Sequence, residues 1–124
     1  MTDSKLLDSS VWIDFFIKDK FYEVINSEEN IFSSVLSLYE IKRKLIKDKI
    51  KMEEINKVLE FIKKRSIILP TDEKISEEAA NLSLKHNLSA IDSLIYATSI
   101  INETRLITLD NDFRGLENIE ILNM

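Results

Sequence analysis

The sequence contains no cysteine and only one proline, one glycine and one histidine among its 124 residues. Without cysteine the chain forms no disulfide and binds no metal through thiolates, which agrees with a reducing, cytoplasmic location. The single glycine, Gly115, excludes a glycine-rich phosphate-binding loop, because such loops need several glycines close together. The single histidine, His86, has no recognisable nucleophile to pair with, and we expect a structural or surface role for it.

Long apolar runs and an excess of basic residues are also missing. No apolar segment approaches the roughly 18 residues that a membrane span needs, and the first residues lack the pattern of a signal peptide. We therefore expect no membrane association. The net charge of -5 argues against a surface that coats nucleic acid broadly. It is compatible with a metal-binding group of acids, which would itself contribute negative charge.

The residues that are present describe an ordinary globular chain, with 44% hydrophobic and 31% charged residues. Its length predicts one domain, residues 1–124. Short apolar runs alternate with helical periodicity, which predicts an α/β fold with a central, mostly parallel sheet of four to five short strands flanked by helices. The expected strands are 5–8, 31–35, 66–69, 105–109 and 119–122. The expected helices are 11–16, 21–26, 37–48, 52–65, 74–87 and 89–102.

Acidic residues recur at one end of these strand–helix units. Asp8 ends the first strand, Glu40 and Asp92 are expected in the first turns of two helices, and Asp110 and Asp112 follow the fourth strand. In a parallel sheet, strand ends and helix starts lie on the same rim, so these side chains are expected to converge. Several carboxylates within a few ångströms repel one another and bind a hard divalent cation such as Mg²⁺ or Mn²⁺.

Each acid also has an ordinary structural explanation. The segments 37–40 and 89–92 fit helix capping boxes, and 109–112 fits a turn. Asp8 either caps the next helix or belongs to a site. The two interpretations are compatible, because a side chain in the first turn of a helix can point out of the helix end. The acids occur together at one end of successive strand–helix units, and this favours a common pocket.

Four segments in this order resemble the PIN domain family, and most closely its VapC-like toxins. They are LLDSSVWIDFF at 6–16 with a D-x-S signature, FSSVLSLYEI at 32–41, LSAIDSLIYATSI at 88–100, and LITLDNDF at 106–113. The resemblance covers essentially the whole chain. One departure is HNLS, where many relatives have glycine after the histidine. Asn87 tolerates the positive φ that this turn needs, so no functional residue is placed in doubt.

The resemblance implies a metal-dependent endoribonuclease that hydrolyses RNA phosphodiester bonds with Mg²⁺ or Mn²⁺. By resemblance Asp8, Glu40, Asp92 and Asp110 are the catalytic, metal-binding acids, and Asp112 is an auxiliary. We expect Asp8 and Asp92 to bind the ion directly, whereas Glu40 and Asp110 bind it directly or through water. The sequence leaves open whether one or two ions act.

Further residues and partners follow less directly. Ser10 matches a small hydroxyl residue that supports the first aspartate, although plain helix capping explains it equally well. The resemblance also implies a homodimer and a cognate antitoxin. Trp12 and Phe15 are expected either in the core or in a groove for a partner. The basic segment 42–51 is either a solvated helix face or a contact for the RNA backbone.

Three rival functions differ in the residues they require. A receiver-type signalling domain needs a second acid beside Asp8, an aspartate in place of Pro70 after the third strand, and a lysine ending the last strand, and all three are missing. A phosphatase with a D-x-D nucleophile is disfavoured because Ser10 occupies the position of the second aspartate. A catalytically silent PIN-like interaction module would have lost acids, and no acid is missing here.

Overall fold

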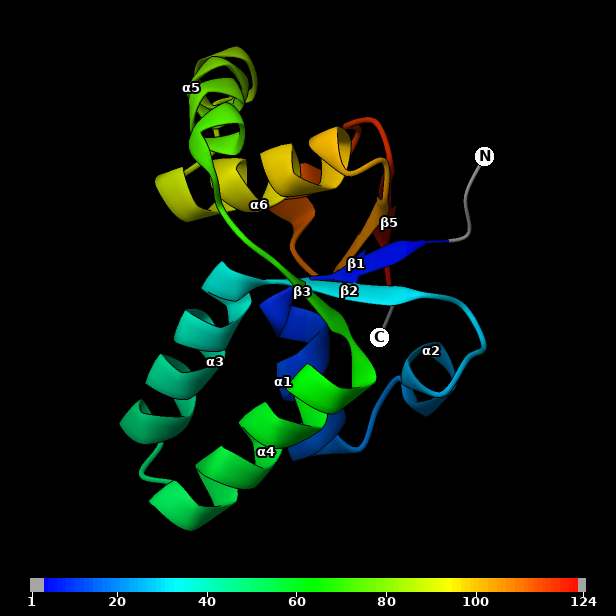
Figure 1. The fold of residues 1–124 in the computed structure, drawn as a ribbon, viewed down its shortest axis with the longest axis vertical. Coiled ribbons are helices and arrows are strands. Elements are labelled where there is room, and N and C mark those ends of the chain that lie inside the picture. The colour runs from blue at the N-terminus through cyan, green and yellow to red at the C-terminus, as the bar shows by residue number, and fades with distance from the viewer. Residues whose placement is uncertain (1–3, 123–124) are drawn as a thin grey trace.

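The computed structural model describes residues 4–122, which form a sheet with helices on both sides (Figure 1). The strands are β1 (Lys5–Leu7), β2 (Ile31–Ser34), β3 (Ile67–Leu69), β4 (Arg105–Thr108) and β5 (Ile119–Ile121). The α-helices are α1 (Ser9–Lys18), α2 (Tyr22–Ile25), α3 (Val35–Lys47), α4 (Met52–Arg65), α5 (Glu73–His86) and α6 (Ala90–Ile101), with a 3-10 turn η1 (Asn111–Phe113). The prediction of an α/β fold is confirmed.

The five strands are all parallel and lie in the order β3-β2-β1-β4-β5. Leu6 in β1 pairs with Phe32 of β2 on one side and Leu106 of β4 on the other. From the central strand β1, the chain first adds β2 and β3 on one side of the sheet. It adds β4 and β5 on the other side later. This order differs from the 2-1-3-4-5 order of receiver domains, so the receiver alternative is wrong.

Alternation along the central strand divides the core into two layers. Leu7 packs with Trp12 and Ile41 under α1 and α3, whereas Leu6 packs with Tyr96 and Phe113 on the opposite face. Figure 1 shows α1, α3 and α4 on one side of the sheet and α5 and α6 on the other. Apolar side chains therefore pack on both faces of the sheet, as is typical of a parallel sheet covered by helices.

Most helix limits agree with the periodicity, but the start of α3 does not. The helix begins at Val35 and its N-cap is Ser34, whose hydroxyl accepts from the Leu36 amide at 3.0 Å. The predicted capping box from Ser37 to Glu40 is therefore wrong, because β2 runs straight into a helix that starts two residues earlier. Glu40 lies in the second turn rather than the first. Asn87 ends α5 with φ 56°, which confirms the expected left-handed C-cap.

The first helix is longer than predicted and begins directly after Asp8. Trp12 is fully buried and donates from Nε1 to the Ser33 hydroxyl at 3.0 Å, so it belongs to the core and not to a partner surface. Phe15 and Phe16 are half-buried; Phe15 stacks on Phe61, whereas Phe16 meets Phe61 edge to face. Within residues 4–122, no helix is long and apolar enough to cross a lipid bilayer.

Candidate metal centre

The predicted acids gather at the carboxyl edge of the sheet. Asp8 directly follows β1, and Asp110 follows the neighbouring strand β4 with one residue between them. Asp112 lies in η1, Asp92 in the first turn of α6 and Glu40 in α3. Because β1 and β4 are parallel neighbours, their ends deliver Asp8 and Asp110 to the same place.

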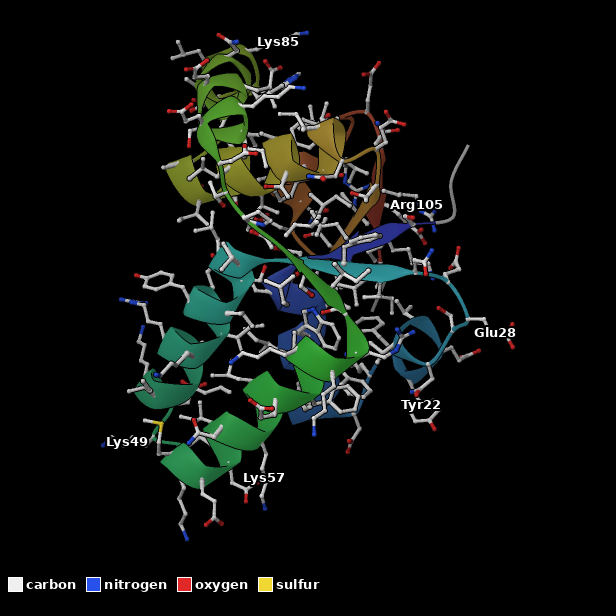
Figure 2. The ribbon with its side chains drawn as sticks, in the orientation of Figure 1. Tyr22, Glu28, Lys49, Lys57, Lys85 and Arg105 are labelled. Carbon is white, nitrogen blue, oxygen red and sulfur yellow. The ribbon has the colours of Figure 1, made fainter. Side chains whose placement is uncertain are left out.

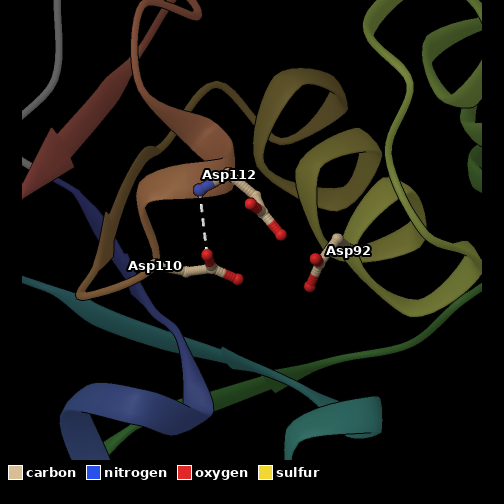
Figure 3. Close-up of side chains that lie close together, drawn as sticks. All are labelled: Asp92, Asp110 and Asp112. Atoms are coloured by element: carbon tan, nitrogen blue, oxygen red, sulfur yellow. Dashed lines mark hydrogen bonds between the residues drawn. The ribbon is translucent and has the colours of Figure 1, made fainter.

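Three of these carboxylates form a tight group. One oxygen from each of Asp92, Asp110 and Asp112 lies within 4.8 Å of the other two, and Figure 3 shows the three side chains facing a common space. Asp110 also accepts a hydrogen bond from the Asp112 amide at 2.9 Å, which confirms the expected turn. Ser89 caps α6 by accepting from the Asp92 amide at 3.3 Å, so the Asp92 carboxylate is left to face the group.

Asp8 lies deeper than the other acids, with only 6% of its surface exposed. It occupies the N-cap position of α1 but makes no side-chain cap bond. Instead its Oδ2 atom accepts from the hydroxyls of Ser10 at 2.9 Å and Thr108 at 2.8 Å. Burial raises the pKa of Asp8, and the nearby charge of Asp110 adds to the effect, while the two hydroxyls oppose it. These contacts fix the orientation of a carboxylate that would otherwise be costly to bury.

Glu40 reaches the same edge from the other side of β1. The Ser9 hydroxyl at the start of α1 donates to Glu40 Oε1 at 3.0 Å. Partial burial raises the pKa of Glu40, and the charges of Asp8 and Asp92 raise it further. The electrostatic influence of both aspartates places Glu40 within the same acidic environment.

The raised pKa of Asp92 is the clearest sign of crowding. Burial, followed by the charge of Asp110, raises it to about 6, and the charges of Asp8 and Asp112 contribute as well. A divalent cation bound among these carboxylates would attract them and so offset the repulsion between their negative charges. The donors are all carboxylate oxygens, which are the ligands that Mg²⁺ and Mn²⁺ prefer. The residues therefore fit the ion that the sequence predicts.

Two hydroxyl contacts were not foreseen from the sequence. Thr108, the last residue of β4, donates to Asp8 and accepts from the Asp110 amide at 3.0 Å, so it links the first acid to the fourth. Ser9 holds Glu40. A signal existed for Thr108, because it ends a strand two residues before the predicted acid Asp110. Ser10 lies where the sequence places it, in contact with Asp8, and its role stays a prediction. His86 lies outside the acidic group, with its ring 6.1 Å from that of Tyr96.

A comparison with models of protein families finds one family whose model covers nearly the whole chain, including all five acids. The model described as "PIN domain" matches residues 5–118. The chain belongs to the PIN domain family. A comparison with curated proteins by sequence returned no match.

Solved structures of the same fold include toxins and toxin–antitoxin complexes. VapBC2 from Rickettsia felis, bound to a promoter DNA fragment, superposes with a TM-score of 0.79 at 21% identity, covering 97% of this chain and 98% of that one. A toxin–antitoxin complex from Klebsiella pneumoniae gives 0.78 at 19% identity, covering 94% and 95%. The sarcin–ricin loop cleaving toxin VapC20 from Mycobacterium tuberculosis gives 0.75 at 13% identity, covering 96% and 99%. At these identities the likeness concerns the fold.

Proposed function

We propose that this PIN-domain protein is a Mg²⁺- or Mn²⁺-dependent endoribonuclease, the toxin of a toxin–antitoxin pair. The observation that carries the proposal is the group of Asp92, Asp110 and Asp112 at one edge of the sheet, with Asp8 and Glu40 close enough to feel its charge. The raised pKa of Asp92, Glu40 and Asp8 supports it, because such shifts are typical of functional sites. The names of the solved neighbours, toxins and toxin–antitoxin complexes, support the biological role.

Asp8, Asp92, Asp110, Asp112 and Glu40 are the residues that would hold the metal. When bound, a divalent ion lowers the pKa of a water and polarises the phosphoryl group. The chain's own hydroxyls keep the carboxylates in place before substrate arrives, since Ser10 and Thr108 orient Asp8 and Ser9 orients Glu40. Such pre-set geometry avoids reorganisation during the reaction.

Glu40 is the group that we assign to proton transfer. Among the described residues only Ser9 donates to its side chain, and it does so to Oε1, which leaves Oε2 available. Glu40 Oε2 would take the proton from the attacking water during hydrolysis of the phosphodiester.

The proposal includes an antitoxin, self-association and a cytoplasmic location. Phe15, Phe16 and Phe61 form a partly exposed aromatic surface between α1 and α4, and Phe61 is 38% exposed. Exposed aromatic groups of this kind are typical of protein interfaces. We assign this surface to the antitoxin. The homodimer rests on family resemblance, and Trp12 cannot contribute to either interface because it is buried.

The test is cleavage of structured RNAs by the purified protein in Mn²⁺ or Mg²⁺, followed on denaturing gels. We expect cleavage with either ion, none in EDTA, and a loss of at least about 100-fold for Asp8→Asn, as is usual when a group central to a metal site is removed. The matched control is Asp19→Asn. Asp19 is exposed and has a left-handed backbone that asparagine tolerates, so the same chemical change should leave cleavage intact.

Cleavage that persists in EDTA, or at full rate in Asp8→Asn, would contradict the proposal. If no RNA in a panel that includes ribosomal and transfer RNA is cleaved while the antitoxin still binds, the silent interaction module is the better description. Light scattering at micromolar concentration tests the dimer.

A further inference from the structure

A groove leads away from the acidic edge between α1 and α3. It has a volume of about 400 Å³. Ser9 and Ile13 line one wall, and Glu40 lies at the end nearest the metal centre. The other residues that line it belong to α3 and are Tyr39, Arg43, Lys44 and Lys47. The groove therefore begins at a carboxylate of the candidate site and continues past three cations.

Two of the three cations of this groove are not neutralised by ion pairs with the described acids. Arg43 and Lys47 are exposed and form no ion pair with any of the described residues, whereas Lys44 pairs with Asp48 at 3.3 Å. Glu40, Arg43 and Lys47 succeed one another at spacings of three and four, so they lie along one face of the helix. In a chain of net charge -5, unpaired cations next to an acidic centre are complementary to a polyanion that reaches into that centre.

An aromatic side chain stands beside the same cations. Tyr39 is 59% exposed and lies next to Glu40 in the sequence. It lines both this groove and an adjoining apolar hollow formed with Lys42, Arg43 and Ile46. An exposed ring among cations is the arrangement that binds single-stranded nucleic acid, because bases stack on the ring while phosphates meet the charges.

We propose that the α1–α3 groove is the track for the single-stranded RNA that flanks the cleavage site, with Arg43 and Lys47 binding phosphates and Tyr39 stacking a base. The inference rests on the proposed ribonuclease function and adds the residues that position the substrate. It assigns to Arg43, Lys47 and Tyr39 a positioning role, since none of them belongs to the acidic group.

Binding without cleavage tests the track directly. A fluorescent single-stranded RNA is titrated in EDTA with wild type, with Arg43→Ala/Lys47→Ala, and with the control Lys64→Ala/Lys85→Ala. The control removes the same charge from exposed lysines of α4 and α5, and Figure 2 shows Lys85 at the far end of the molecule. We expect the groove variant alone to bind about tenfold more weakly. The slope of log K for RNA binding against log salt concentration should be less steep by about 1.4 for this variant. Each lost phosphate contact to a single strand contributes about 0.7 to that slope, and two contacts are removed.

The stacking contact has its own pair of variants. Tyr39→Ala should weaken RNA binding about tenfold, whereas Tyr39→Phe keeps the ring and should bind as wild type does. Tyr22→Ala is the control, because Tyr22 is 68% exposed on α2, which Figure 2 shows on the opposite side of the molecule from α3. In cleavage assays with Mn²⁺, the groove variants should raise KM with little change in kcat.

The outcomes separate the two proposals. Equal RNA affinity of the groove and control double variants would overturn the track, whether or not the protein cleaves RNA. Loss of antitoxin affinity in the groove variants with unchanged RNA affinity would also overturn it, and would assign the groove to the antitoxin. Absence of cleavage in every RNA would contradict the proposed function, while the titrations in EDTA would still decide the track.

Discussion

Asp92 shows how a single residue serves both the fold and the site. Its amide completes the cap of α6, which any residue could do, but its carboxylate stands beside Asp110 and Asp112. Its pKa rises from 3.8 to about 6, mainly through burial and then through the charge of Asp110. The folded protein thus binds a proton at this site more tightly than the unfolded chain does.

The sign of the resulting pH dependence follows from linkage. Stabilisation by the protonated Asp92 is complete below pH 3.8 and is lost as the pH rises through about 6. In EDTA the free energy of unfolding should therefore fall across this interval, by roughly 1–2 kcal/mol after allowance for solvent screening. Asp92→Asn should reduce the fall, whereas Asp19→Asn should not. Urea denaturation at a series of pH values measures the free energy of unfolding. An equal fall with pH for wild type and Asp92→Asn would contradict the prediction.

At the scale of elements, the junction between β2 and α3 determines where Glu40 lies. The segment 33–37 offers three serines, and each could cap a helix by its residue type alone. The pairing of Ser34 with Leu69 in β3 extends the strand to that residue, and the helix starts immediately afterwards. Ser37 is consequently buried inside α3, where its hydroxyl has no partner among the described residues.

These two serines give a matched pair of variants. Ser34→Ala removes the cap and should lower the free energy of unfolding by about 1 kcal/mol. Ser37→Ala removes a buried hydroxyl without a partner, so it should change stability by less than about 0.5 kcal/mol or increase it. Urea midpoints at constant m-value measure both. If Ser37→Ala lowered the free energy of unfolding more than Ser34→Ala does, Ser37 would be the cap.

The contrast between these serines explains what could be predicted from the sequence. The helix at 52–65 was predicted with its observed limits because apolar periodicity is a local property. The acids were placed at one edge because parallel strands share their direction. Thr108 could be noticed at the end of its strand, but its contact with Asp8 crosses 100 residues and that of Ser9 with Glu40 crosses 31, so no local pattern gives the partners. The two hydroxyls resemble those of any other serine or threonine until the sheet is assembled.

At the scale of the whole molecule, the metal should act as a stabilising ligand. An ion that binds only the folded state adds about 2.7 kcal/mol when its concentration is 100 times Kd. We expect Mn²⁺ to raise the Tm of the wild type by several degrees, and to raise that of Asp92→Asn by less. Thermal unfolding in EDTA and in a Mn²⁺ series measures the shift, with Asp19→Asn expected to follow the wild type. If Mn²⁺ shifts no Tm, the five acids do not form the proposed site.

The central position of β1 has a consequence for the synthesis of the protein. The ribosome releases Asp8 100 residues before Thr108, whose hydroxyl orients it, and Asp110 follows Thr108 closely. A nascent chain therefore displays Asp8 and Glu40 while the other half of the site is still untranslated. For the proposed ribonuclease, this chain order delays activity during synthesis, because RNA cleavage becomes possible only once β4 has paired with β1.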